Sequence, residues 1–303
     1  MRSLAALMAV ALALGSTGGP ARPVQLTKSE AAAAVAAIDK SREQARTWLR
    51  SSPESYLAAV ARRDFGSQAA LTVGSAADND LQVDRPGVTP HHLRVTVEGE
   101  RFRVEAVDAA AQFTVNGNAV RRATIPPSPV GIGRMSLRLS HQGFPAIIVL
   151  DPESPHFKQY KGLRHFPVDL AYRFELPLTP NPKPEEVIVM STRGNQRRAL
   201  RAGWFDFVVG EKPWRLEAVR LLEPGVGDAT LSVFFRDATS GKETYPLGRY
   251  VDAARLPDGR YRLDFNAAYN PACAFSDHYN CPVPSRANHL AVAIRAGEMT
   301  PPK

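Results

Sequence analysis

The sequence predicts a mainly β protein in which an N-terminal helix precedes an antiparallel β-sandwich and a larger β domain. Its 303 residues include 25 prolines and 21 glycines, a frequency of turn-forming residues that favours many short strands over a helical bundle. From residue 69 onward, apolar and polar residues alternate in short runs, as in half-buried antiparallel strands. No long helical pattern separates the later runs, so parallel βαβ units are not indicated.

The chain begins with a pattern typical of a secretory signal peptide. Arg2 precedes an apolar run from Leu4 to Leu14, and small residues follow that run. The run is shorter than the roughly 20 residues that a membrane-spanning helix needs. We therefore predict that residues 1–21 are cleaved, that the mature protein is periplasmic or extracellular, and that no later segment spans a membrane. An uncleaved N-terminal anchor is the alternative.

A helical lead-in is predicted over residues 28–62. Thr27 and Glu30 have the spacing of a capping box, and strong helix formers follow them up to residue 49. Ser51-Ser52-Pro53 ends this helix. Pro53 also suits the start of a second, shorter helix, which we predict over residues 54–62.

A small β-sandwich is predicted over residues 69–125, followed by a proline-rich boundary and a β-rich domain over residues 130–298. In the first part, Asn116-Gly117 is typical of the tight turn of a hairpin. The expected strands of the second part are 135–139, 146–150, 172–176, 187–190, 205–209, 216–222, 231–235, 261–265 and 290–294.

The net charge of +8, from 38 Lys and Arg against 30 Asp and Glu, limits the classes of partner. The arginines are scattered, and aromatic residues do not interleave with them as a base-stacking surface would require. We therefore expect no nucleic-acid binding. A basic surface with affinity for an anionic envelope component is the simpler interpretation.

The C-terminal third resembles the bacterial domain of unknown function 1684 family. The residues that carry the resemblance read TSG..TY..GRY over 239–250, LDFN..YNP.CAF over 263–275 and CPVP over 281–284, with GLRHFPVD upstream at 162–169. Because the family name assigns no activity, the resemblance implies a shared fold and leaves the function open.

The N-terminal half is similar in layout to a forkhead-associated β-sandwich, through Gly74, Thr89, His92 and Asn116-Gly117. The phosphothreonine site of that fold needs an arginine after the glycine, and Ser75 stands there instead. Without a guanidinium there is no bidentate partner for a phosphate. The resemblance therefore implies the sandwich, and we predict no binding of phosphothreonine peptides.

The densest polar cluster lies at the end of an apolar strand and comprises Asp264, Asn266, Tyr269 and Asn270. Asp264 and Asn266 have the same parity, so their side chains share one face of a strand. We expect the loops 239–250 and 264–284 to fold together and to bring Arg249, Asp264 and Asn266 to one concavity. These residues are the candidate site for an envelope or extracellular ligand; caps of an irregular loop are the structural alternative.

An extracytoplasmic hydrolase whose catalytic groups converge only in the fold is the alternative function. The sequence contains no catalytic serine motif, and Gly131-x-Gly133 lacks the rest of a dinucleotide-binding pattern. Cys273 and Cys281, the only cysteines, are predicted to form a disulfide in an exported protein. A metal site using both thiolates with His278 is the alternative, but the spacing does not favour it. We therefore predict no metal or cofactor.

Overall fold

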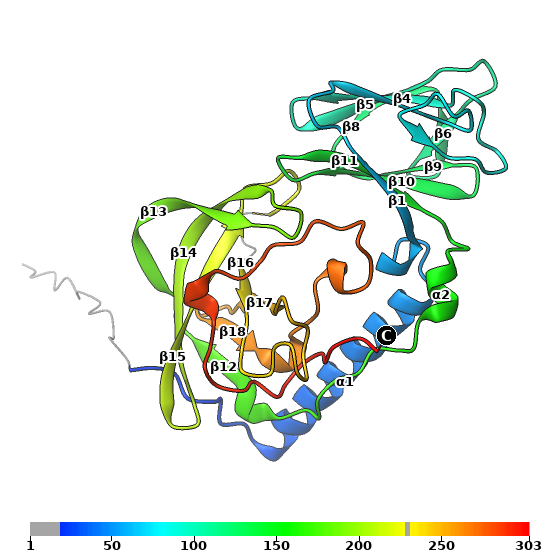
Figure 1. Cartoon of the computed structure of the whole chain (residues 1–303). Helices are drawn as coiled ribbons and strands as arrows, with labels where there is room; N and C mark the ends of the chain where they lie inside the picture. The colour runs from blue at the N-terminus through cyan, green and yellow to red at the C-terminus, as the bar shows by residue number, and fades with distance from the viewer. Residues whose placement is uncertain (1–18, 228–230, 303) are drawn as a thin grey trace, which may run out of the picture.

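The computed structural model describes residues 19–227 and 231–302, so almost all of the predicted signal peptide lies outside the described residues. The predicted mainly β fold is confirmed: a long N-terminal helix precedes a β-sandwich and a strongly curved sheet (Figure 1). Among the described residues, no helix is long and apolar enough to cross a membrane.

Two local signals in the sequence form the predicted structures. Helix α1 (Lys28–Ser51) starts with a capping box, in which Thr27 Oγ1 accepts from Glu30 N and the Glu30 carboxylate accepts from Thr27 N. Asn116 and Gly117 join β6 (Phe113–Val115) to β7 (Asn118–Val120) with φ of +49° and +80°. Both residues adopt the left-handed conformation that a type I′ turn requires.

The β-sandwich consists of two sheets. One has the order β1-β11-β10-β9-β6-β7 and the other β3-β2-β4-β5-β8. The remaining strands are β1 (Ala59–Asp64), β2 (Ala70–Gly74), β3 (Leu81–Gln82), β4 (Leu93–Glu98), β5 (Arg101–Ala106), β8 (Arg122–Ile125), β9 (Pro129–Ile132), β10 (Met135–His141) and β11 (Pro145–Leu150).

The helix predicted over residues 54–62 is wrong. Only a short 3₁₀ turn, Tyr56–Ala58, precedes β1, which pairs antiparallel with β11. Helix propensity is a weak local preference, and here the pairing with a buried, apolar strand overrides it. The chain therefore enters the sandwich ten residues before the first strand we predicted.

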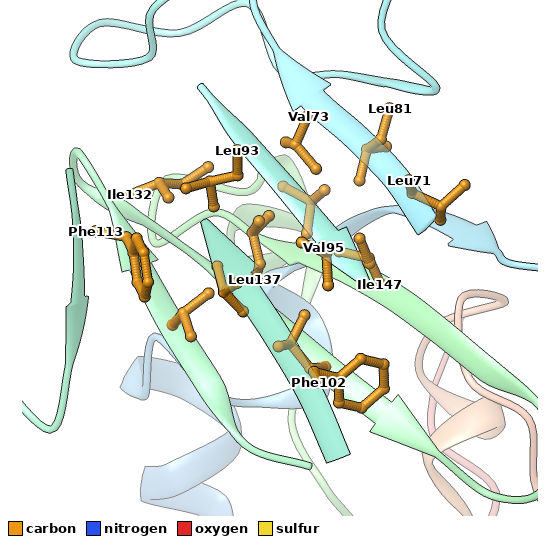
Figure 2. Packing of buried hydrophobic residues seen from close by; sticks show 14 of the residues in the cluster. Leu71, Val73, Leu81, Leu93, Val95, Phe102, Phe113, Ile132, Leu137 and Ile147 are labelled. Atoms are coloured by element: carbon orange, nitrogen blue, oxygen red, sulfur yellow. The ribbon is translucent and has the colours of Figure 1, made fainter. Parts of the chain in front are cut away.

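The sandwich also extends beyond residue 125. Strands β9 to β11 complete one of its sheets, so the predicted boundary at residues 126–129 lies inside the sandwich. Side chains from both sheets interdigitate in one core, with Leu71 and Val95 from one sheet facing Leu137 and Ile147 from the other (Figure 2). Alternating apolar residues on each inner face produce this packing.

The larger domain is a seven-stranded sheet of order β12-β18-β17-β16-β15-β14-β13. Its strands are β12 (Arg173–Leu176), β13 (Thr179–Met190), β14 (Gln196–Val209), β15 (Lys212–Leu221), β16 (Leu231–Phe235), β17 (Arg249–Arg255) and β18 (Tyr261–Asp264). Short helical pieces connect the rest: α2 (Pro155–Gln159), η2 (Leu170–Tyr172), η3 (Phe265–Ala267), η4 (Ala272–Ala274) and η5 (Arg286–Asn288).

The strand predicted over residues 290–294 is wrong, since this segment is irregular. Its apolar residues Leu290 and Ile294 are buried against the inner face of the curved sheet, so alternation here reflects burial without strand pairing. Strand β17 was not predicted, although its residues pair with β16 and β18.

An apolar seam joins the sandwich to the curved sheet. Ile148 and Leu150 of β11 pack in one buried cluster with Val219, Phe234 and Tyr250 of the larger domain. Because this cluster is continuous with neither of the two domain cores, it provides a separate hydrophobic contact between them.

Candidate functional site

A cleft of about 490 Å³ lies between one face of α1 and the curved sheet. Strands β12, β17 and β18 contribute residues to its floor, and the C-terminal chain contributes Glu298 at one rim. The volume is in the range of small-molecule sites. We call it the α1 cleft; its lining residues are Ala34, Ala37, Ile38, Ser41, Arg42, Ala45, His165, Arg173, Asp252, Ala254, Arg262, Asp264, Asn266, Ala267, Ala268, Tyr269 and Glu298.

Helix α1 forms the apolar wall of the cleft. Ala34, Ile38 and Ala45 recur at helical spacing, so they lie on one face. Arg42 lies on the same face and is only 8% exposed; its guanidinium donates to Phe166 O at 3.0 Å and to Asn266 O at 3.2 Å. These two bonds attach the helix to the C-terminal half of the chain.

The structure brings the predicted residues Asp264, Asn266 and Tyr269 into this cleft. Asp264 Oδ2 accepts from Arg173 Nη1 at 2.6 Å, and its Oδ1 accepts from the backbone and side-chain nitrogens of Asn266. The Tyr269 hydroxyl donates to Asp252 Oδ2 at 3.0 Å. All three therefore line the cleft with hydrogen bonds already made.

The prediction that Arg249 shares this concavity with Asp264 is wrong. Arg249 is 1% exposed and donates to the carbonyl oxygens of Ala296, Ile294 and Glu298, while its ion-pair partner is Asp237. The side chain clamps the C-terminal segment from behind the cleft. Nothing in the local sequence distinguishes an arginine that binds carbonyls from one that binds a ligand.

Asn270 also lies outside the cleft lining. Its backbone N–H donates to Glu298 Oε2 at 2.7 Å, and its side-chain amide donates to Met299 O at 2.8 Å. Asn270 therefore positions Glu298, and any effect on a ligand is indirect. The expected packing of the loops is present, because Tyr250 pairs with Tyr269 and the Tyr245 hydroxyl donates to Cys273 O.

Two further groups line the cleft that the sequence did not single out, His165 and Glu298. They face each other in an isolated antiparallel bridge, in which Phe166 N donates to Gly297 O and Met299 N donates to Arg164 O. This pattern makes His165 and Glu298 a non-hydrogen-bonded pair, whose side chains lie close together on one face. The sequence signal for His165 was its position inside the motif GLRHFPVD at 162–169, and Glu298 follows Ala296-Gly297 downstream of the CPVP motif.

Glu298 is the least satisfied carboxyl of the cleft. It is 7% exposed, and Oε2 accepts from Asn270 N, whereas no hydrogen bond to Oε1 is formed by the described residues. Burial raises the pKa of Glu298 to about 7, although the hydrogen bonding of Asn270 and the charges of Arg249 and Arg42 offset part of the effect. The carboxyl is therefore poised to exchange a proton near neutrality.

His165, which is paired with Glu298, is a neutral hydrogen-bond donor. Burial lowers its pKa to about 3, with further lowering from the charges of Arg42 and Arg46. Arg46 Nη2 lies 3.4 Å from Nδ1, and since arginine only donates, Nδ1 is the acceptor. The proton of the neutral ring is then on Nε2, which is left as a hydrogen-bond donor.

The predicted disulfide is wrong, because Cys273 and Cys281 are both free and too far apart to be bonded. Cys281 Sγ instead accepts from Cys273 N at 3.2 Å, and the Tyr245 hydroxyl donates to Cys273 Sγ at 3.8 Å. The alternative of a metal site with His278 has no support either, since the described residues contain no group of three metal-ligating side chains.

The turn end of the sandwich, residues 74–92, is held by internal hydrogen bonds. Asn79 Nδ2 donates to Ala76 O and Pro90 O, while the buried His92 ring bonds Thr89 N and Gln112 O. Gly74 is needed for this packing, since a Cβ there would lie 2.0 Å from Pro90 O.

Comparisons with known proteins agree with both parts of this architecture. The protein family of unknown function DUF1684 matches residues 158–299, and the FHA domain family matches residues 71–131. The first match contains the polar floor and rim of the α1 cleft.

Individual relatives carry no assigned activity for the larger domain. An uncharacterized protein from locus rrnAC0354 of Haloarcula marismortui is 35% identical over 50% of this chain and 83% of its own, with a TM-score of 0.40. The uncharacterized protein y4yQ of Sinorhizobium fredii is 40% identical over 73 residues, 23% of this chain and a quarter of its own length. The FhaA FHA domain, solved with the intracellular domain of Rv3910, is 18% identical over 29% of this chain and 96% of its own, with a TM-score of 0.22.

Proposed function

We propose that this chain, which belongs to the DUF1684 family of proteins of unknown function, binds a small amphipathic molecule in the α1 cleft. The carrying observation is the asymmetry of that cleft, which has an apolar helix face on one side and charged, hydrogen-bonding side chains on the other. Binding sites for small organic molecules combine apolar walls with a few placed polar groups in this way.

This proposal narrows the site that the sequence suggested. Asp264, Asn266 and Tyr269 remain part of it as lining residues, while Arg249 and Asn270 support it from behind. The loop 239–250 contributes no lining residue; its Thr239 and Thr244 are buried and bonded to each other.

The experiment measures thermal stabilisation by a panel of eight-carbon probes: octanoate, octanol and octylamine. A ligand that binds only the folded state raises the melting temperature, and we expect at least one probe to do so. Ala34→Phe should abolish the shift by filling the cleft, because Ala34 lines it. Ala33→Phe is the matched control, since Ala33 is exposed on the same helix and does not line the cleft. Failure of all three probes would refute the proposal.

A hydrolase acting on an amphipathic ester is the second candidate. The specific observation in its favour is that Glu298 and His165 lie together in the cleft, as a carboxyl near its pKa and a neutral N–H donor. Such a carboxylate could take a proton from water as the water attacks the ester carbonyl. Hydrolysis of p-nitrophenyl octanoate that disappears in Glu298→Gln would support an enzyme; a rate equal to that of buffer would leave the binding function alone.

Export to the periplasm or extracellular space is part of the proposal and depends on the leader pattern of residues 1–21. An envelope or extracellular origin of the ligand follows from it. Fusing residues 1–30 to alkaline phosphatase, which is active only outside the cytoplasm, tests this point. An active fusion is expected, and removal of residues 4–14 should abolish its activity.

A further inference from the structure

The hydrogen-bonding groups of the α1 cleft divide into those that are occupied and those that are free. Both oxygens of Asp264 are bonded, and so are both oxygens of Asp252, by Ser232 and Tyr269. Arg262 binds Glu175 through Nε and Nη2. These side chains are committed to the protein, so they do not determine which ligand the cleft accepts.

Apart from the buried Nε atoms of Arg42 and Arg173, the free groups are concentrated at the His165–Glu298 pair. His165 offers Nε2–H, and Glu298 offers the carboxyl oxygen that lacks a bond. Arg42 is adjacent and bonds only backbone carbonyls, so no carboxylate of the described residues forms an ion pair with it. The His165 N–H donor and the Arg42 guanidinium therefore lie around a single titratable acceptor, the Glu298 carboxyl.

The charge of the lining depends on that acceptor. Three arginines, Arg42, Arg173 and Arg262, oppose three carboxyl groups, Asp252, Asp264 and Glu298. With Glu298 ionised these charges cancel, whereas protonation of Glu298 leaves one positive charge and creates an O–H donor. The groups that face the Glu298 carboxyl are Arg42 of α1, Arg249 of β17, Asn270, the neutral His165, and the hydroxyls of Tyr160 and Tyr269, whose pKa values are raised by burial and by the charge of Glu298.

We propose that the ligand of the α1 cleft is an amphipathic organic acid whose carboxylate binds beside Glu298 while that side chain takes up a proton from solvent. The ligand carboxylate accepts hydrogen bonds from the Glu298 O–H and from His165 Nε2–H, and its chain lies along the apolar face of α1. Two carboxyl groups at one site share a proton because both cannot ionise side by side. This inference depends on the binding function proposed above and specifies the ligand's charge.

Proton uptake on binding makes the affinity for the ligand depend on pH by a calculable amount. Octanoate is almost entirely ionised between pH 6 and pH 8, so nearly all of the change in protonation occurs on the protein. Because burial raises the pKa of Glu298 to about 7, a requirement for the protonated form weakens binding about tenfold from pH 6 to pH 8. A cationic ligand would require the carboxylate and would bind more tightly as pH rises.

Calorimetric titration of octanoate into the full chain at pH 6, 7 and 8, in two buffers of different ionisation enthalpy, tests the inference. We expect weaker binding at higher pH and net proton uptake at pH 7. Glu298→Gln should abolish both effects, since an amide donates at every pH. Glu223→Gln is the matched control: Glu223 is a buried carboxyl with a raised pKa outside the cleft, and the pH dependence should persist.

His165→Phe is the second variant, and it should weaken octanoate binding several-fold while retaining the pH dependence. If Glu298→Gln does not fold, this variant and the pH profile of the unchanged protein decide the question. Octanoate binding that is independent of pH, or tighter octylamine or octanol binding, would overturn the inference and leave the binding function intact. If none of the three probes binds, the binding function itself is rejected.

Discussion

The α1 cleft and the turn end of the β-sandwich differ in how their polar side chains are used. At the turn end, Asn79 and His92 bond backbone groups of neighbouring turns and so hold the loops in place. In the cleft, the Glu298 carboxyl has one oxygen without a hydrogen bond from the described residues. The turn end also has an unpaired atom, Asn79 Oδ1, but that atom is buried, whereas the Glu298 carboxyl lines a cleft. An unpaired polar atom therefore indicates a binding surface only where a ligand can reach it.

The largest expected effect tests the clamp behind the cleft. Arg249→Met removes the partner of the buried Asp237 and of three backbone carbonyls. Breaking one side of a buried ion pair costs about 3–5 kcal/mol, so we expect loss of folding or a free energy of unfolding lowered by that amount in urea titrations. Arg295→Met is the control, because that arginine is exposed and pairs with Glu243; less than about 1 kcal/mol is expected. Equal effects of the two variants would show that Arg249 is no clamp.

The next effect is the pH dependence of folding stability that Glu298 gives to the cleft. The folded-state pKa of about 7 lies above the ordinary glutamate pKa of about 4.5, so the folded state binds the proton more strongly. The stabilisation is therefore complete below about pH 4.5 and is lost as pH rises to 7, by about 3 kcal/mol in total. In urea unfolding, the free energy of unfolding of Glu298→Gln should lack this pH-dependent loss. The stability of the variant relative to the unchanged protein should therefore increase between pH 5 and pH 8. If the free energies of unfolding of the two proteins changed in parallel with pH, the raised pKa of Glu298 would be contradicted.

A smaller effect is expected from Asp264→Asn, which keeps the shape of the side chain and removes its charge. Because Asp264 is bonded to Arg173 and Asn266, its role in the cleft is structural, and the free energy of unfolding should fall by about 1–3 kcal/mol. Octanoate binding per folded molecule should persist. Loss of binding with unchanged stability would instead assign Asp264 to the ligand and erase its difference from Glu298.

The smallest expected effect is at the turn end of the sandwich. Fluorescence titration with phosphothreonine peptides and their unphosphorylated forms should show no preference for phosphate, because Ser75 provides no guanidinium fork. Micromolar binding that depends on the phosphate would show that this end is also a binding surface.

Local chemistry was predictable from the sequence wherever neighbouring residues determine it. Thr27 with Glu30, and Asn116 with Gly117, each complete a motif within a few residues, and both form as expected. The shared strand face expected for Asp264 and Asn266 is not formed, because β18 ends at Asp264 and Asn266 lies in the 3₁₀ turn Phe265–Ala267. The two side chains meet because Asp264 caps that turn.

The errors concern residues whose partners are distant in the chain. Arg249 carries the same residues around it whether it binds a ligand or the carbonyls of residues 294–298, and only folding decides. Glu298 is unremarkable in sequence, and its pKa depends on burial by elements more than 100 residues away. The helix expected over 54–62 failed for the same reason, since pairing with β11 is a long-range contact.

The position of Gly297 limits how the cleft can be built during synthesis. Its φ is +77°, and a Cβ would lie 2.5 Å from Ala268 O, so the chain next to Glu298 packs against the 265–268 segment only with glycine at this position. Helix α1 leaves the ribosome more than 200 residues before this segment, and loop closure over such separations is slow compared with helix formation. The apolar face of α1 that lines the cleft therefore acquires its floor only after residues 252–268 have been made.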